Sequence, residues 1–153
     1  MTRQILTDSY PNADIEIKKM FFLPENSDEF DFSEYDYVVD AIDNVTAKIA
    51  IIVKAKEEGA NVISCMGMGN KFDPTQIQIA DIYKTSVCKL AKVMRKELKA
   101  RGIKKLKVAF STEIPVKPLF CADGNDERIP GSSPFVPPCA GIIMAGEIVK
   151  DLL

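Results

Sequence analysis

Two nearly continuous apolar segments, separated by one helix-like stretch, restrict the fold of this chain more than any other feature. Residues 35–42 (YDYVVDAI) and 60–66 (ANVISCM) both have the pattern of strands that are covered on two faces. Between them, residues 45–58 are rich in Ala, Ile and Lys and are followed by Gly59, a favourable residue for ending a helix. Parallel strands need such a connection, and it is almost always right-handed. The pattern therefore predicts a doubly wound α/β fold with a mostly parallel sheet.

The rest of the chain continues the alternation of strands and helices, so we expect one α/β domain over residues 1–153. The further expected elements are the end of a helix at 2–9, a partly exposed strand at 13–22 (ADIEIKKMFF), a more exposed strand at 75–82 (TQIQIADI), a helix that stops near Gly102, a strand at 105–111 (KLKVAFS) and a final apolar helix at 139–153. The helix before Gly102 would bury a stripe formed by Val87, Leu90, Ala91, Met94 and Leu98. Residues 113–138 are rich in Pro and Gly and predict a long loop.

Small residues in the final helix indicate close packing on the sheet or on a partner subunit. They are Ala140, Gly141, Ala145 and Gly146.

Composition removes several classes of function. With 153 residues, 46% of them hydrophobic, and a formal net charge of -2, the chain can form a real core and has no overall attraction to nucleic acid or membranes. No apolar stretch reaches the roughly 20 residues of a membrane-spanning helix, and the N-terminus lacks a signal-peptide core, which predicts a cytoplasmic protein. The sequence has no histidine, and its four cysteines form no C-x-x-C pair. Histidine-dependent nucleophiles are therefore excluded within this chain, and a zinc site is disfavoured.

Two acids mark the junction between the first apolar strand and the helix after it. Asp40 interrupts the strand, and Asp43 and Asn44 stand immediately before the helix. In open α/β sheets, ligands bind at the carboxyl ends of the strands. Asp and Asn are also preferred helix N-caps, and we favour that role for Asn44. Asp43, with Asp40, offers oxygen ligands that could hold Mg²⁺ against phosphates.

A basic cluster follows between residues 84 and 107. Its members are Lys84, Lys89, Lys92, Arg95, Lys96, Lys99, Arg101, Lys104, Lys105 and Lys107, and Glu97 is the only acid among them. A solvated helix face would explain many of these lysines. A more specific alternative is a surface that binds the phosphates of a nucleic acid. The cluster has no interleaved aromatic residues, so base stacking on it is not expected.

The glycines of CMGMGN and the thiols carry weaker signals. Gly67 and Gly69 lack the third glycine of a dinucleotide fingerprint, so they predict a purely structural turn or a close backbone approach beside a nucleotide. Cys65 and Cys139 fall in apolar segments where cysteine behaves as a small hydrophobe, and Cys121, in the long loop, has no basic neighbours that would activate it. We therefore expect no catalytic thiol.

Several ordered blocks carry a resemblance to a known family. The segments YDYVVDAIDNVTAK, GANVISCMGMGNKFDPTQIQIADIYKT, LAKVMRKELKARGI and VAFSTEIPVKP resemble the HesA/MoeB/ThiF family of adenylating enzymes, which are related to ubiquitin-activating proteins. Within it, FDPT, DIYKT and RKELK are most similar to the branch of tRNA threonylcarbamoyladenosine dehydratases. The resemblance implies a Rossmann-like fold and covers almost the whole chain.

One part of the family pattern is absent. The glycine-rich nucleotide loop, the ribose-binding acid and the phosphate-directed arginine and lysine precede the matching blocks in the family, and we do not assign Arg3 to that arginine. We therefore expect this chain to correspond to the C-terminal part of an adenylating enzyme and to be inactive alone.

The resemblance implies that ATP and Mg²⁺ are the cofactors and that a carboxylate becomes activated as an acyl-adenylate. In this branch the carboxylate would belong to a threonylcarbamoyl group on tRNA, which then cyclises with loss of water. Asp43 matches the family acid that helps to hold ATP and Mg²⁺, and Asp40, Ala41 and Asn44 belong to the same motif. Lys84, Arg95, Lys96 and Lys99 are the candidates for tRNA contacts, and a homodimer is expected.

Two other functions remain open. One is activation of the C-terminus of a ubiquitin-like sulfur-carrier protein, and the other is a noncatalytic oligomerising or tRNA-binding module.

Overall fold

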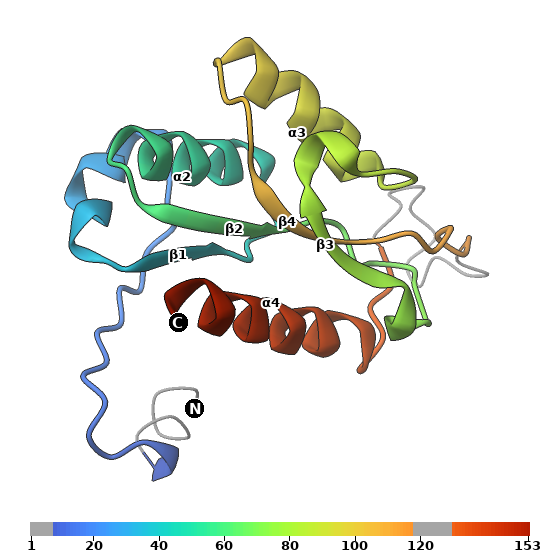
Figure 1. Cartoon of the computed structure of the whole chain (residues 1–153), viewed down its shortest axis with the longest axis horizontal. Helices are drawn as coiled ribbons and strands as arrows, with labels where there is room; N and C mark the ends of the chain where they lie inside the picture. Colours follow the sequence, from blue (N-terminus) through green and yellow to red (C-terminus); the bar gives the residue numbers. More distant parts are fainter. Residues whose placement is uncertain (1–7, 118–129) are drawn as a thin grey trace.

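The computed structural model describes residues 8–117 and 130–153 and contains a four-stranded mixed sheet (Figure 1). The strands are β1 (Tyr37–Asp40), β2 (Asn61–Cys65), β3 (Ile77–Asp81) and β4 (Lys107–Ser111), and their order in the sheet is β1-β2-β4-β3. β1, β2 and β4 are parallel, whereas β3 runs antiparallel to β4. The expectation of a mostly parallel sheet is confirmed.

The crossover between β1 and β2 is the helix α2 (Val45–Glu57). Asn44 caps its first turn, because the side-chain Oδ1 accepts a hydrogen bond from the amide of Ala47 at 2.9 Å. Gly59, two residues beyond the helix, has a φ of 76°, a left-handed conformation that glycine adopts without steric cost. Both ends of this helix were thus predicted correctly from local sequence.

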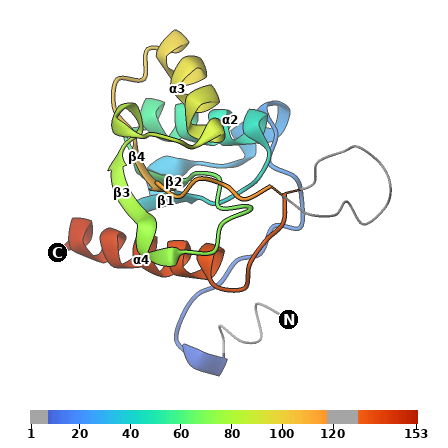
Figure 2. The same ribbon diagram turned by 90° about the vertical axis from the view of Figure 1, so that its right-hand side faces the viewer.

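Helices cover both faces of the sheet and form three layers. α2 and α3 (Lys89–Ala100) lie on one face, and α4 (Val136–Leu152) lies on the other (Figures 1 and 2). One buried cluster, which includes Ile52, Met94 and Leu98, fills the space under α2 and α3. A second, which includes Ile63 and Met144, lies between the sheet and α4. Residues of β2 such as Val62 and Ile63 belong to different clusters, which explains the continuous apolar pattern of that strand.

The strand predicted at 13–22 is wrong. Residues 13–19 adopt no regular secondary structure and pair with no strand in the described part of the chain. A strand needs a neighbour to accept its backbone hydrogen bonds, and alternation alone does not supply one. After this segment, Phe22, Phe30 and Phe32 form an aromatic cluster around the short 3-10 helices η1 (Pro24–Glu29) and η2 (Phe32–Glu34). Of the helix predicted at 2–9, only residues 8 and 9 fall within the described residues, and they are helical.

Two further boundaries differ from the predictions. Val87 precedes α3, has a φ of 60° and is 49% exposed, so it does not belong to the buried stripe of that helix. α4 begins at Val136 inside the predicted loop 113–138, because prolines are tolerated in the first turn of a helix, where backbone amides have no partner in the helix. The part of that loop at 118–129 lies outside the described residues.

The small residues of α4 do not share one environment. Ala140 is buried against the sheet, whereas Gly141, Ala145 and Gly146 are exposed on the outer face. Close packing on the sheet therefore involves only the first of them. Within the described residues, none of the helices has the length and apolar character required to cross a bilayer.

A polar network fastens α4 to the sheet near the amino ends of β1 and β4. Lys107 donates to Glu147 at 2.9 Å and to Asp151 at 2.6 Å, and the Tyr37 hydroxyl donates to Asp151 at 2.7 Å. Burial, followed by this hydrogen bond, raises the pKa of Tyr37 to about 12. Hydrogen bonds from Lys107 lower the pKa values of both carboxyl groups. The network therefore stabilises the folded state while the two acids are ionised.

The second glycine of CMGMGN, Gly69, lets two segments of the chain pack closely against each other. A Cβ atom on Gly69 would lie 2.8 Å from Cβ of Pro130, whereas one on Gly67 would make only ordinary contacts at 3.7 Å. The amide of Asn70, which follows, donates to the carbonyl oxygen of Gly131, and the carbonyl oxygen of Asn70 accepts from the amide of Val116. Gly69 thus makes a close approach within the protein, whereas an approach of this segment to a nucleotide stays a prediction.

Removal of the Lys107 ammonium tests the α4 network. We expect Lys107→Met to lower the midpoint of urea unfolding at neutral pH. The pKa values of Glu147 and Asp151 are lowered in the folded protein, so their contribution is present above the ordinary values of 4.5 and 3.8 and is lost as pH falls through the folded values. The difference in urea unfolding midpoint between the variant and the wild type should become smaller from neutral to acidic pH when unfolding is followed by circular dichroism. A constant difference would contradict this account.

Two glycine-to-alanine substitutions should have opposite effects. Gly69→Ala forces a methyl group against Pro130 and is expected to destabilise the fold by about 1–3 kcal/mol. Gly141→Ala, in the exposed face of α4 with open space around it, is expected to stabilise by about 0.5–1 kcal/mol. Equilibrium unfolding in urea measures both, and equal effects of the two variants would refute the close contact at Gly69.

Candidate functional site

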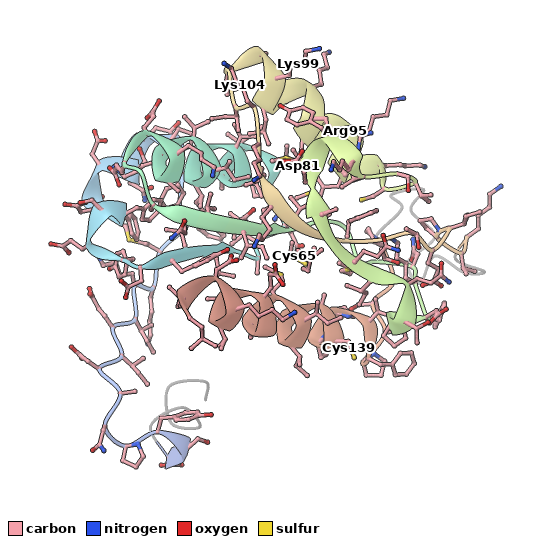
Figure 3. The ribbon with its side chains drawn as sticks, in the orientation of Figure 1. Cys65, Asp81, Arg95, Lys99, Lys104 and Cys139 are labelled. Carbon is pink, nitrogen blue, oxygen red and sulfur yellow. The ribbon has the colours of Figure 1, made fainter. Side chains whose placement is uncertain are left out.

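The candidate site lies where β1 and β2 end and α2 begins. Asp40 is the last residue of β1, Ser64 is its partner in β2, and residues 41–44 form the turn into α2. Figure 3 shows Cys65, the last residue of β2, on the side of the sheet that faces α4. The turn therefore lies at the carboxyl ends of two adjacent parallel strands, as predicted.

Asp40 is completely buried and fully engaged with protein groups. Its Oδ1 and Oδ2 atoms lie 3.1 and 3.0 Å from Nζ of Lys48, its Oδ2 accepts a hydrogen bond from the Ser64 hydroxyl, and its Oδ1 accepts one from the Ile42 amide at 3.3 Å. This geometry does not support the expectation that Asp40 contacts a nucleotide. Its carboxylate instead joins the ends of β1 and β2 and the first turn of α2.

Lys48 is the residue that the sequence reading missed. Its side chain is 1% exposed, and Nζ also donates to the carbonyl oxygen of Ile42 at 2.8 Å. The sequence did indicate that Lys48 is buried, because it falls on the helix stripe that also contains Ile51, Ile52 and Ala55. A lysine on an apolar stripe needs a buried acceptor, and Asp40 was the acid within reach.

Asp43 and Asn44 occupy different environments from Asp40. Asn44 uses its side chain to cap α2, which confirms the capping role favoured for it. Asp43 is exposed, and its carboxylate has no hydrogen-bond or ion-pair partner among residues 8–117 and 130–153. Ala41 is exposed in the same turn. Of the two acids, only Asp43 is therefore accessible to a ligand.

The site lacks a preformed metal cage. No group of three or more Cys, Asp or Glu side chains that could hold a metal ion occurs among the described residues. Mg²⁺ is usually held by one or two carboxylates together with substrate phosphates and water. One accessible carboxylate, Asp43, is compatible with that kind of binding and not with a site built from protein ligands alone.

The described thiols show no sign of activation. Cys65 is partly buried, and burial raises the pKa of its thiol. Cys88 is buried and accepts a weak hydrogen bond from the Ala91 amide at the start of α3. Cys139 is partly buried in the first turns of α4, and Cys121 lies outside the described residues.

The basic residues on α3 form a stripe that faces solvent. Lys89, Lys92, Lys96 and Lys99 are separated by three or four residues, so they share one helix face over about 15 Å. All four are exposed and have no ion-pair partner among the described residues. We call these four residues the α3 lysine stripe. Lys84 is also exposed, and Figure 3 shows Lys99 and Lys104 at the far end of the stripe, away from the sheet.

Arg95 differs from the lysines around it. Its guanidinium group donates to the carbonyl oxygen of Thr85 at 3.1 Å and also to the Thr85 hydroxyl. These contacts fix the turn between β3 and α3 and leave Arg95 only half-exposed. Within the basic cluster at residues 84–107, the other two residues with partners in the described part of the chain are Arg101, paired with Glu97 at 2.8 Å, and Lys107, in the α4 network. The free positive charge is thus concentrated on lysines.

A groove between α2 and α3 does not contain the acids. It has a volume of about 500 Å³ and is lined mainly by apolar residues such as Ile49, Val53 and Val93. Val45 and Thr46, the first residues of α2, also contribute to it. The accessible Asp43 is therefore on an open surface beside this groove.

Similarity to known proteins extends over the whole sequence. The family model described as ThiF family matches residues 1–153. The chain is 40% identical over 159 residues to a Bacillus subtilis tRNA threonylcarbamoyladenosine dehydratase, covering 97% of this chain and 63% of that protein. It is 33% identical over 116 residues to the Escherichia coli dehydratase, covering 71% of this chain and 43% of that protein. The chain thus spans less than two thirds of the length of these relatives.

Solved structures agree with the observed fold. The E. coli tRNA N6-threonylcarbamoyladenosine dehydratase in complex with AMP matches with a TM-score of 0.85 and 29% identity, over 97% of this chain and 61% of that one. The same enzyme in complex with ATP matches with a TM-score of 0.83 and 27% identity, over 97% and 60% of the two chains. By its sequence over all 153 residues and by its fold, this chain belongs to the ThiF family.

Proposed function

We propose that this chain is the part of an ATP-dependent adenylating enzyme that supplies Asp43 to the nucleotide, and that the enzyme dehydrates threonylcarbamoyladenosine in tRNA. The single observation that carries the proposal is the exposed carboxylate of Asp43 at the carboxyl ends of β1 and β2, which has no hydrogen-bond or ion-pair partner in the described part of the chain. The names of the relatives, and the AMP and ATP complexes of the E. coli enzyme, support the choice of substrate and cofactor. Activity is proposed for a protein of the relatives' full length, of which this chain spans less than two thirds.

Asp43 would bind the Mg²⁺ that accompanies ATP, and Asn44 would keep α2 in place behind it. When bound, Mg²⁺ neutralises phosphate charge and assists departure of pyrophosphate. The chain contributes a fixed negative charge and, through the exposed turn at Ala41, a backbone surface that a nucleotide can approach. Asp40 is buried, so it would support this surface without contact to the ligand.

The α3 lysine stripe would bind tRNA phosphates, together with Lys84. Its four exposed ammonium groups lie along one line, which suits a polyanion better than a small metabolite. Arg95 would contribute indirectly, because its hydrogen bonds to Thr85 hold the turn from which α3 starts. With no aromatic residue on the stripe, binding would rest on charge and would depend strongly on salt.

Substitution of Asp43 tests the nucleotide role. In the full gene product, we expect Asp43→Ala to abolish ATP-pyrophosphate exchange and to leave the unfolding midpoint nearly unchanged, because the side chain is exposed and unpartnered. Asp36→Asn is the matched control, since Asp36 is an exposed acid that precedes the opposite end of β1. Normal exchange by Asp43→Ala would refute the assignment.

The tRNA role is tested by salt dependence. Lys96→Gln combined with Lys99→Gln should weaken tRNA binding and reduce the slope of log K against log salt by about 2, since each lysine accounts for about one phosphate contact. Lys19→Gln combined with Lys150→Gln removes the same charge from exposed positions outside α3 and should leave the slope nearly unchanged. Filter binding at several salt concentrations measures both slopes. Equal slopes for the two double variants would argue against binding of tRNA phosphates by the α3 lysine stripe.

A further inference from the structure

We propose that Lys48 is a positioning residue for Asp43: its buried ammonium group fixes the turn that presents Asp43 to the nucleotide. The inference rests on the function proposed above, because it concerns the same site. Lys48 itself is 1% exposed and cannot touch a ligand on the surface.

The first step of the argument is that Asp43 does not fix its own position. Its side chain has no partner among the described residues, so its location depends on the backbone on either side. Asn44, on one side, is held by its cap to Ala47 and by its carbonyl oxygen, which accepts from the Lys48 amide at 2.9 Å. Ile42, on the other side, is held through its amide by Asp40 and through its carbonyl oxygen by Nζ of Lys48.

The second step is that Lys48 contributes to both anchors. Its backbone amide binds Asn44, and its side chain reaches back to Ile42 and Asp40. The two contacts span residues 42–44 and enclose Asp43 between them. Loss of the side-chain contact would free the carbonyl oxygen of Ile42 while leaving the helix cap intact.

The third step separates positioning from stability. A buried ion pair can often be replaced by neutral groups without loss of stability, whereas removal of one partner leaves an unpaired buried charge. Lys48→Met alone would leave Asp40 uncompensated. The double variant Asp40→Asn, Lys48→Met removes both charges and keeps similar volumes. The carboxamide oxygen can still accept from the Ile42 amide, and its NH2 group can donate to the Ser64 hydroxyl oxygen, whereas the ammonium donor to the carbonyl oxygen of Ile42 is lost.

The test compares stability, amide exchange and ATP binding in the full gene product. We expect Lys48→Met to be clearly destabilised and the double variant to recover much of the loss. In the double variant, hydrogen exchange of a peptide covering residues 42–47 should still be at least tenfold faster than in wild type. Its dissociation constant for ATP with Mg²⁺, measured by calorimetry, should rise about 10- to 100-fold, the usual effect of losing a group that orients a ligand-binding residue.

Lys107→Met is the matched control. It removes another lysine that is paired with acids, but one located at the opposite ends of the strands. It should lower stability without changing ATP affinity or exchange at residues 42–47. If it reproduced the effects of the double variant, those effects would reflect general destabilisation and the proposal would be overturned.

Asp43→Ala distinguishes failure of this inference from failure of the proposed function. If Asp43→Ala loses ATP affinity but the double variant binds ATP like wild type, Lys48 is only structural and the inference is overturned. Unchanged exchange at residues 42–47 in the double variant would overturn it as well. If hydrogen exchange at residues 42–47 rises as expected in the double variant but Asp43→Ala still binds ATP normally, the result supports the proposal that Lys48 fixes the turn. In that case the proposed role of Asp43 in nucleotide binding fails.

Discussion

The buried pair formed by Asp40 and Lys48 is the interaction on which the rest of this structure depends. It lies where β1, β2 and α2 meet, and Ser64 completes it from the neighbouring strand. Two charges in a protein interior are costly unless each is paired and hydrogen-bonded, and here both conditions are met. The pair therefore fixes how the first strand turns into the helix, and with it the shape of the surface above.

This arrangement gives the two acids separate tasks. Asp40 is fully buried and organises the protein, whereas Asp43 is exposed and has its charge available for a ligand. Asp43 needs no partner of its own because the residues on both sides of it are held. A carboxylate that is free but well positioned can bind a cation or a phosphate-bound metal without first breaking a contact within the protein.

Charges that are paired within the protein and charges that face solvent are also separated elsewhere in the molecule. Lys107, Glu147 and Asp151 join α4 to the sheet near the amino ends of β1 and β4, while the α3 lysine stripe faces solvent on the other side of the sheet (Figures 1 and 3). Arg95 belongs to the first group in spite of its place on α3, because its guanidinium group is bound to Thr85. The number of positive charges on a helix is therefore a poor guide to how many are available for a polyanion.

The sequence alone determined the β1-α2-β2 unit, the caps at Asn44 and Gly59, and the place of Asp43 at a strand end, because these follow from local hydrophobic pattern and turn chemistry. It also carried the family resemblance, which the match over residues 1–153 confirmed. Only the tertiary structure decided which side chains meet. It placed Asp40 against Ser64 of the neighbouring strand, bound Arg95 to Thr85 and left residues 13–19 without a strand partner in the described part of the chain. Pairing between distant groups depends on their positions in space, and a one-dimensional pattern does not contain those positions.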